Sequence, residues 1–404
     1  MLSRQQPAGP ARPGPHVLVV RADNAGDVLL SGPATRAVAA RAGRLTYLCG
    51  PRGEEAARML PGVDAVVRAS LSWIVAEPAP TDRRGTLQLV ERLTRLAVDE
   101  AVILTSFHQS PLPLALVLRM AGVGRISATS VDYPGSLLDV RVHPDDELHE
   151  VERGLRLAEA AGFPLPAGDD RRLRVRLPAG PEGIGSGVAD GIGAGSGLAD
   201  GIGAGATPGV AAGVAVLGDL AAGLDRPYVV VHPGASVPAR AWAPERMAAL
   251  VAALDRRGWG VVVTGAPSER RLTAAVAGVG SGAGSGVVDA GGRTSLVELA
   301  QLLTGAAALV TGNTGPAHLA AATGTPVVSL YAPTVPAHRW RPWMVPHVLL
   351  GNQLIACRDC RARHCPVPGH PCIDEVTVDT VVDAVAELAG AAPTLTPSAT
   401  EAAG

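Results

Sequence analysis

Short apolar runs alternate with longer amphipathic stretches in the first part of the chain. The predicted strands are His16–Ala22 (HVLVVRA), Leu45–Cys49 and Ala101–Thr105. The predicted helices run from about Asp27 to Arg41, over Leu112–Ala121 and over Glu147–Ala161. Short buried strands that alternate with helices indicate βαβ units and a parallel sheet.

The same alternation returns in the second half of the chain. Its predicted strands are Tyr228–His232, Gly260–Thr264, Ala308–Thr311 and Pro326–Tyr331. Its predicted helices are Pro244–Arg257, Leu296–Thr304, Pro316–Ala322 and Val378–Leu388. The chain has 404 residues, of which 47% are hydrophobic, and a single core stops growing at roughly 250–300 residues. We therefore predict two Rossmann-like α/β domains.

The alternation stops between the two halves, where Gly, Ala and Ser dominate. The decapeptide SGVADGIGAG at 186–195 recurs as SGLADGIGAG at 196–205. Such a segment buries too little apolar surface to offset the entropy of ordering it, and both its period and its few acidic residues argue against a calcium-binding repeat. The predicted organisation is a disordered start (1–15), a first domain (16–177), a flexible linker (178–225), a second domain (226–390) and a disordered tail (391–404).

The charge balance says little about the fold but limits the classes of binding partner. The net charge is −2 and every basic side chain is Arg, so no basic excess points to nucleic acid, and an anion site must use Arg or backbone N–H groups. No apolar run approaches the ~20 residues of a membrane helix, and the first residues lack the apolar stretch of a secretion signal. We expect a cytoplasmic protein without a transmembrane segment; peripheral membrane association stays open.

The stretch from Val310 to Ala322 is the most informative part of the chain. A strand ends, a Gly-rich turn follows, and a helix begins with Pro316 in its first turn. Either Thr314 or Gly315 would cap this helix. Backbone N–H groups at the positive end of a helix dipole form an anion site. The alternative is an ordinary capped helix.

The segments Asn313–Pro316, His318–Ala322 and Gly324–Val328 resemble the signature of glycosyltransferase family 9, the ADP-heptose heptosyltransferases. The resemblance implies the GT-B architecture, in which two Rossmann-like domains face a cleft. It also implies that Thr314 and Gly315 offer N–H groups to the donor diphosphate, and that His318 lies against that group or orients the turn. Asn313 stands where the family commonly has Asp at the donor sugar, and Asn carries no charge.

Two further segments extend the resemblance to the donor side. His232–Ser236 is followed by Arg240, and the family places a hydroxyl and a Lys here on the donor phosphates. The resemblance therefore assigns Ser236 and Arg240 to the phosphates, since Arg is a permanently charged, bidentate clamp. Without the family, Arg240 reads as a surface charge. Glu269 would bind ribose hydroxyls or serve as a carboxylate at a helix start.

The loop between the first strand and helix, Arg21–Leu30, resembles the family segment that ends in Gly-Asp. The resemblance implies that Asp27 is the general base, which needs its carboxylate within about 3 Å of the acceptor hydroxyl. The alternative is that Asp27 caps the helix, and Asp23 is a weaker candidate for the base.

The resemblance implies an inverting transfer of heptose or a similar sugar from a nucleoside-diphosphate sugar, ADP-linked by analogy with the family. The acceptor would be a cell-surface glycan or a metabolite, as in lipopolysaccharide core biosynthesis. No cofactor is required for this transfer. Two alternatives are a sugar-nucleotide epimerase on the same fold and a non-catalytic nucleotide-sugar-binding protein, which the uncharged Asn313 favours. The acceptor cannot be read from this sequence.

Four cysteines form the pattern C-x2-C-x4-C-x6-C: Cys357, Cys360, Cys365 and Cys372. Four thiolates can hold a tetrahedral structural zinc. The spacing is not that of a standard zinc finger, so iron–sulfur ligation, free thiols and disulfides stay as alternatives.

Overall fold

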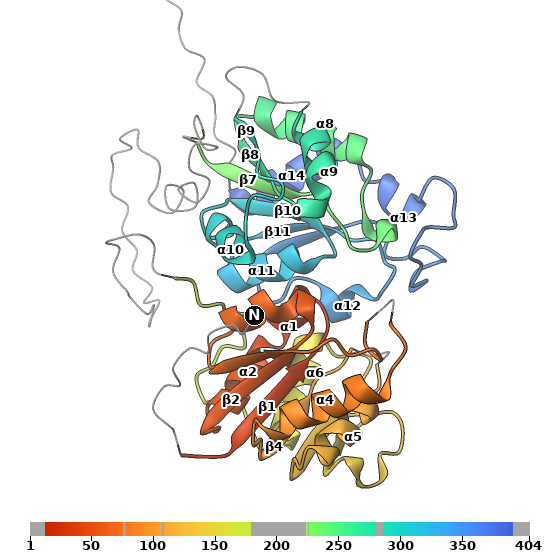
Figure 1. Ribbon diagram of the computed structural model, residues 1–404. Coiled ribbons are helices and arrows are strands. Elements are labelled where there is room, and N and C mark those ends of the chain that lie inside the picture. The colour runs from red at the N-terminus through yellow and green to blue at the C-terminus, as the bar shows by residue number, and fades with distance from the viewer. Residues whose placement is uncertain are drawn as a thin grey trace, which may run out of the picture.

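The computed structural model describes residues 13–75, 78–106, 109–178, 224, 226–278 and 286–390. These residues form two α/β domains, stacked one above the other in Figure 1, each built on a six-stranded parallel sheet. The predicted linker and the predicted disordered ends lie almost entirely outside the described residues. The predicted fold class is therefore confirmed.

The first domain has the strand order β3-β2-β1-β4-β5-β6. Its strands are β1 (His16–Arg21), β2 (Arg44–Cys49), β3 (Ala65–Arg68), β4 (Glu100–Ile103), β5 (Arg125–Thr129) and β6 (Val140–Val142). Its helices are α1 (Ala25–Leu30), α2 (Gly32–Ala39), α3 (Glu54–Met59), α4 (Arg83–Thr94), α5 (Leu112–Met120) and α6 (Glu150–Ala160). Strand β1 is central and buried on both faces, which explains its unbroken apolar run.

The second domain has the order β12-β11-β10-β7-β8-β9. Its strands are β7 (Tyr228–His232), β8 (Gly260–Val263), β9 (Val287–Asp289), β10 (Ala308–Gly312), β11 (Val327–Leu330) and β12 (His347–Leu350). Its helices are α8 (Pro244–Arg256), α9 (Arg270–Ala277), α10 (Leu296–Thr304), α11 (Gly315–Thr323), α12 (Ala337–Trp340), α13 (Pro371–Asp374) and α14 (Val378–Ala389). Strands β7 and β10 are the central pair, so their carboxyl ends lie side by side.

The prediction of one helix from Asp27 to Arg41 is wrong. The helix begins earlier, at Ala25, and Ser31 divides it into α1 and α2. The buried hydroxyl of Ser31 donates to the carbonyl of Val28 (2.6 Å) and lies 2.6 Å from the hydroxyl of Tyr47. A serine that bonds to the preceding turn in this way competes with the regular helical pattern.

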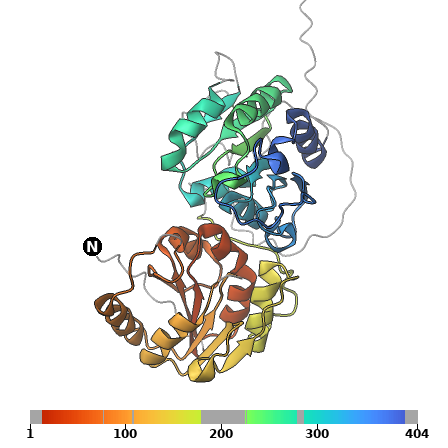
Figure 2. The ribbon, with the colours of Figure 1, turned by 90° about the vertical axis from the view of Figure 1, so that its right-hand side faces the viewer.

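The two domains pack directly on each other through α1 and α11 (Figure 1). One hydrophobic cluster contains buried residues of both helices and continues into both domains. At one side, the N–H of Leu296 donates to Glu55 across the interface (2.7 Å). Figure 2 shows the same contact from the side, with the C-terminal helix α14 on the second domain. In the described part of the chain, no helix is long and apolar enough to span a membrane.

Candidate functional site

The turn between β10 and α11 leaves backbone donors free at the start of a helix. Thr314 is the N-cap residue, in an extended conformation, and its side chain makes no capping hydrogen bond. The Thr314 hydroxyl instead lies 3.1 Å from the hydroxyl of Thr311. Pro316 has no N–H and the N–H of Ala317 donates to the Thr314 carbonyl (3.1 Å), so the N–H of Gly315 is the donor of this first turn that keeps its capacity to bind an anion.

Side chains tie the carboxyl ends of the neighbouring strands together beneath this turn. The Thr311 hydroxyl donates to the carbonyl of His232 (3.1 Å), and Nδ1 of His232 lies 3.1 Å from the hydroxyl of Thr264. Because β10, β7 and β8 are adjacent in the sheet, these bonds fix the position of the turn. A rigid platform of this kind favours precise placement of a ligand.

Asn313 and His318 are both buried and both uncharged at neutral pH. The Asn313 amide donates to the hydroxyl of Tyr331 (3.1 Å). Burial, together with the nearby His149, lowers the pKa of His318 to about 3. The buried Nδ1 of His318 has no hydrogen-bond partner among the described residues. An unpaired buried nitrogen is costly, so this ring is a candidate ligand contact.

Arg240 lies beside the same turn, in the short 3-10 helix Pro238–Arg240. Its Nε donates to the hydroxyl of Thr334 (3.1 Å), and a Cβ added at Gly312 would lie 3.0 Å from the Arg240 carbonyl oxygen. Burial lowers the pKa of Arg240, whereas Tyr331 and Asp27 act in the opposite direction. The interpretation of Arg240 as a free surface charge is therefore wrong.

Ser236 and Glu269 both lie near the carboxyl end of strand β7, but in the described part of the chain only Glu269 is held by a hydrogen bond. Ser236 is exposed in the loop after β7. Glu269 accepts a hydrogen bond from the N–H of Ala266 (2.7 Å) and lies against Gly234, where an added Cβ would be 2.1 Å from its carboxylate. The Glu269 carboxylate therefore lies beside the loop that carries Ser236. Its bond to the Ala266 N–H also makes it a carboxylate at a helix start, the alternative role predicted for it.

Asp27 comes from the other domain. It is the third residue of α1, and the N-cap is Asn24, so the interpretation of Asp27 as the cap is wrong. Its carboxylate pairs with Arg21 (3.0 Å) and its side chain is 20% exposed. Burial raises the pKa of Asp27 to about 6, although Arg21 opposes this shift. A carboxylate of this kind can accept a proton near neutral pH.

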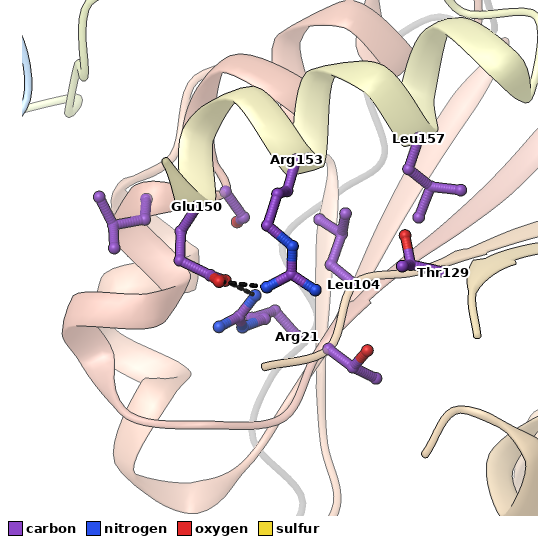
Figure 3. A pocket seen from close by; sticks show the side chains of 10 residues that line it. Arg21, Leu104, Thr129, Glu150, Arg153 and Leu157 are labelled. Atoms are coloured by element: carbon purple, nitrogen blue, oxygen red, sulfur yellow. Dashed lines mark hydrogen bonds and ion pairs between the residues drawn. The ribbon is translucent and has the colours of Figure 1, made fainter. Parts of the chain in front are cut away.

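A buried ionic network surrounds Arg21 and was not predicted from the sequence. Arg21 contacts Asp23 (2.7 Å), Glu150 (3.1 Å) and the hydroxyl of Ser106 (2.8 Å). Figure 3 shows Glu150 and Arg153 on α6 meeting Arg21 across a small pocket. The one available signal was an Arg at the end of an otherwise apolar strand, followed by an acidic loop.

The two half-sites meet at a pair of glycines. A Cβ added at Gly26, the residue before Asp27, would lie 3.0 Å from Cα of Gly315 and 3.0 Å from Cδ2 of His318. Only a residue without a side chain allows this approach. The structure thus brings Asp27, Arg240, Thr314, Gly315 and His318 to one interdomain contact.

The four clustered cysteines line a separate hollow of the second domain, together with His370. All four are free thiols. No group of three or more His, Cys, Asp or Glu side chains in the described residues is arranged to hold a metal ion. The structural zinc at Cys357, Cys360, Cys365 and Cys372 therefore stays a prediction, which metal analysis of the purified protein tests.

The paired sheets, with a helix-start turn at the carboxyl end of a central strand, define an α/β protein of GT-B architecture. Residues 210–370 match the sequence model of glycosyltransferase family 9 (heptosyltransferase). Lipopolysaccharide heptosyltransferase 3 of Escherichia coli is 35% identical over 123 residues, which are 30% of this chain and 36% of that protein. The second domain is therefore similar in sequence to glycosyltransferase family 9.

Solved structures extend the likeness of fold to both domains. The glycosyl transferase family 9 from Veillonella parvula superposes with a TM-score of 0.69, covering 93% of this chain and 97% of that chain at 14% identity. The E. coli ADP-heptose lps heptosyltransferase II gives a TM-score of 0.66, covering 93% and 98% at 18% identity. The chain's sequence match spans about a third of the length of its curated relative, whereas the shared fold spans nearly the whole of these structures.

Proposed function

We propose that the protein is an inverting glycosyltransferase that moves heptose or a similar sugar from an ADP-linked donor to a cell-surface glycan or a metabolite. One observation supports the proposal: Asp27 of the first domain lies close enough to Arg240 of the second to act on its pKa, and the neighbouring Gly26 packs against Gly315 and His318. The solved E. coli structure of similar fold is named an ADP-heptose lps heptosyltransferase, and that name supports the choice of donor. A cytoplasmic location belongs to the same proposal.

In the proposed reaction the acceptor hydroxyl attacks the anomeric carbon of the donor sugar, and the bond from that carbon to the diphosphate oxygen breaks. Asp27 accepts the proton of the hydroxyl. The departing nucleoside diphosphate is stabilised by Arg240, Ser236 and the N–H groups of Thr314 and Gly315. Arginine and backbone donors provide this stabilisation, so the transfer requires no cofactor.

The remaining donor contacts follow from where the side chains lie. Asn313 would face the donor sugar, with its orientation fixed by the bond to Tyr331. Glu269 would bind the ribose hydroxyls from beside Gly234. His318 would offer its unpaired nitrogen to the diphosphate side of the turn. The two domains separate to admit the donor and close over it, which excludes water from the transfer.

Calorimetry with a panel of nucleotide sugars tests the proposal: ADP-heptose, ADP-glucose, GDP-mannose, UDP-glucose and the free diphosphates. We expect selective binding of an ADP-sugar, weakened at least about tenfold by Arg240→Ala (~1.4 kcal/mol). Arg256→Ala, which removes an exposed Arg from the last turn of α8, is the matched control and should bind normally.

The other outcomes have definite meanings. Selective binding of GDP- or UDP-sugars would discard heptose and keep the transferase. Binding without any donor turnover would favour the non-catalytic binder, and conversion of the bound sugar to its epimer would favour the epimerase. A folded protein that binds none of the panel would refute the donor site.

A further inference from the structure

Arg21 is a buried cation shared by three carboxylates. Only 4% of the residue is exposed, and its guanidinium pairs with Asp23 through Nε (2.7 Å), Asp27 through Nη2 (3.0 Å) and Glu150 through Nη1 (3.1 Å). Nη1 and Nη2 donate hydrogen bonds to Glu150 and Asp27, Nη2 also donates to the Ser106 hydroxyl (2.8 Å), and Nε makes only an ion-pair contact with Asp23. Because the guanidinium is planar and rigid, the partners of two nitrogens fix where the third one points.

Glu150 provides one of these fixed points from a distant element. Its side chain is 1% exposed, and its two oxygens accept hydrogen bonds from Arg21 and Arg153. Figure 3 shows both bonds at the Glu150 carboxylate, with the guanidinium groups of Arg21 and Arg153 next to each other. A carboxylate with both oxygens engaged cannot rotate freely, so Glu150 holds the guanidinium of Arg21 in the plane that faces Asp27.

The residue before Glu150 is anchored to the second domain. His149 is the N-cap of α6, and its Nδ1 accepts a hydrogen bond from the N–H of Val151 (3.2 Å). Nε2 therefore carries the proton and donates to the carbonyl of Arg341 (3.0 Å). The His149 ring also packs on Trp343, with 4.4 Å between ring centroids. The start of α6, and Glu150 with it, is thus held in place by the domain that binds the donor.

We propose that Glu150 is a positioning residue, which acts through Arg21 to hold the Asp27 carboxylate toward the interdomain contact. The proposal rests on the proposed function of Asp27 as the base. Its alternative is a purely structural ion pair, because buried ion pairs by themselves say little about function. The two differ in whether removing the charge of Glu150 changes the behaviour of Asp27.

The charged and titratable groups around Asp27 give the direction of that change. They are Arg21 on β1, Asp23 in the same loop, Glu150 on α6, Arg240 of the second domain and His318 on α11 beside Gly26. Burial raises the pKa of Asp27, Arg21 lowers it, and Asp23 and Glu150 raise it. Replacing Glu150 by a neutral residue therefore lowers the pKa of Asp27.

The experiment compares Glu150→Gln with Glu152→Gln, a change of the same kind on the same helix. Glu152 accepts from the N–H of His149 (3.2 Å) and Gln can keep that bond, so it controls for damage to α6. Release of ADP from ADP-heptose, with water as the acceptor, is followed from pH 4.5 to 8. For Glu150→Gln we expect kcat to fall about tenfold to a hundredfold, an unchanged KM, and an acid limb moved down by roughly one pH unit.

A second measurement does not need turnover. Carbon-13 labelling of the Asp carboxyl groups follows the titration of Asp27 by NMR, and Asp27→Asn assigns its signal. Glu150→Gln should lower the midpoint of this titration, Glu152→Gln should leave it in place, and Glu150→Asp, which keeps the charge, should restore it. Melting curves of all variants confirm that they are folded.

The outcomes separate the two proposals. Equal behaviour of Glu150→Gln and Glu152→Gln in both measurements, with Asp27→Asn inactive, would overturn the positioning role and leave the base. An active Asp27→Asn would remove the base, and the role of Glu150 would fall with it.

Discussion

The two halves of the site are built on opposite electrostatic principles. In the first domain, Asp27 belongs to a buried network of charged side chains around Arg21. In the second domain, the turn at Thr314 presents backbone N–H groups among uncharged neighbours, and Arg240 is the cation at its side. The difference fits the two proposed roles. Neighbouring charges can shift the pKa of a carboxylate so that it accepts a proton, whereas uncharged N–H donors can stabilise an anion.

The comparison also shows why the domains can meet closely. The negative charge of Asp27 is paired within its own domain, and His318 is kept neutral by burial. Neither Asp27 nor His318 therefore brings an unpaired charge into the apolar contact between α1 and α11. An unpaired charge buried there would be costly. Under the proposed function, Arg240 is the charged group of the second half-site that would pair with the donor diphosphate.

The largest expected effect comes from removing the proton acceptor. Asp27→Asn keeps the shape of the side chain but cannot take a proton, so we expect donor turnover to fall by about 10²–10⁴-fold with donor binding nearly unchanged. Asp23→Asn is the matched variant, because Asp23 is already engaged by Arg21, Ser106 and Gln109. Steady-state rates and calorimetry measure both. A larger loss for Asp23→Asn would transfer the role of base to that residue.

A bulky residue at the glycine contact should separate the two half-sites. Gly26→Val places atoms where Gly315 and His318 lie 3.0 Å from the first added carbon, so the domains must move apart. We expect turnover to fall roughly tenfold and small-angle scattering to report a larger radius of gyration.

Gly32→Ala controls for the change of glycine itself. Its added carbon makes ordinary contacts, with Leu60 at 3.5 Å and Arg36 at 4.0 Å, and alanine favours a helix by up to about 1 kcal/mol. This variant should be as active as the wild type and at least as stable. An unchanged radius and rate for Gly26→Val would show that close contact at Gly26 is not required.

The sequence predicts the strands and turns better than the buried ion pairs around Arg21. Unbroken apolar runs predict buried strands such as β1 and β7. Glycines predict the turn before Pro316. The cap of α10 is equally local, because the Ser295 side chain accepts from the N–H of Glu298 three residues on. These features depend on residues close together in the chain, so local patterns are enough to find them.

Contacts between distant parts of the chain were missed for the same reason. Arg21 and Glu150 are 129 positions apart, and Arg21 and Ser106 are 85 apart. No periodicity links them, and only the order of the strands brings their elements together. The inner strand β5 and the edge strands β3, β6, β9 and β12 were also missed. The edge strands are only partly buried and β5 mixes polar with apolar residues, so neither shows the apolar run that marks a buried strand.

The smallest effects should come from the neutral histidine of each domain. Burial lowers the pKa of His149 to about 4 and that of His318 to about 3, whereas both rings take up a proton near pH 6.5 when the chain unfolds. The unfolded state then binds more protons, so the free energy of unfolding falls as pH decreases from 6.5 toward 5. Asp27 acts in the opposite direction below about pH 6, because its raised pKa lets the folded state bind a proton first.

Each histidine should therefore contribute about 1 kcal/mol per pH unit to this slope. Urea unfolding at pH 6.5, 5.75 and 5 measures it. His149→Asn keeps an acceptor for the cap of α6, and His318→Asn keeps a polar group at the turn, so each should flatten the slope by its own share. His364→Asn, at an exposed position, should leave it unchanged. If only His149→Asn flattened the slope, the ring in the second domain would not be held neutral, and the contrast between a charged first half-site and an uncharged second one would fail there.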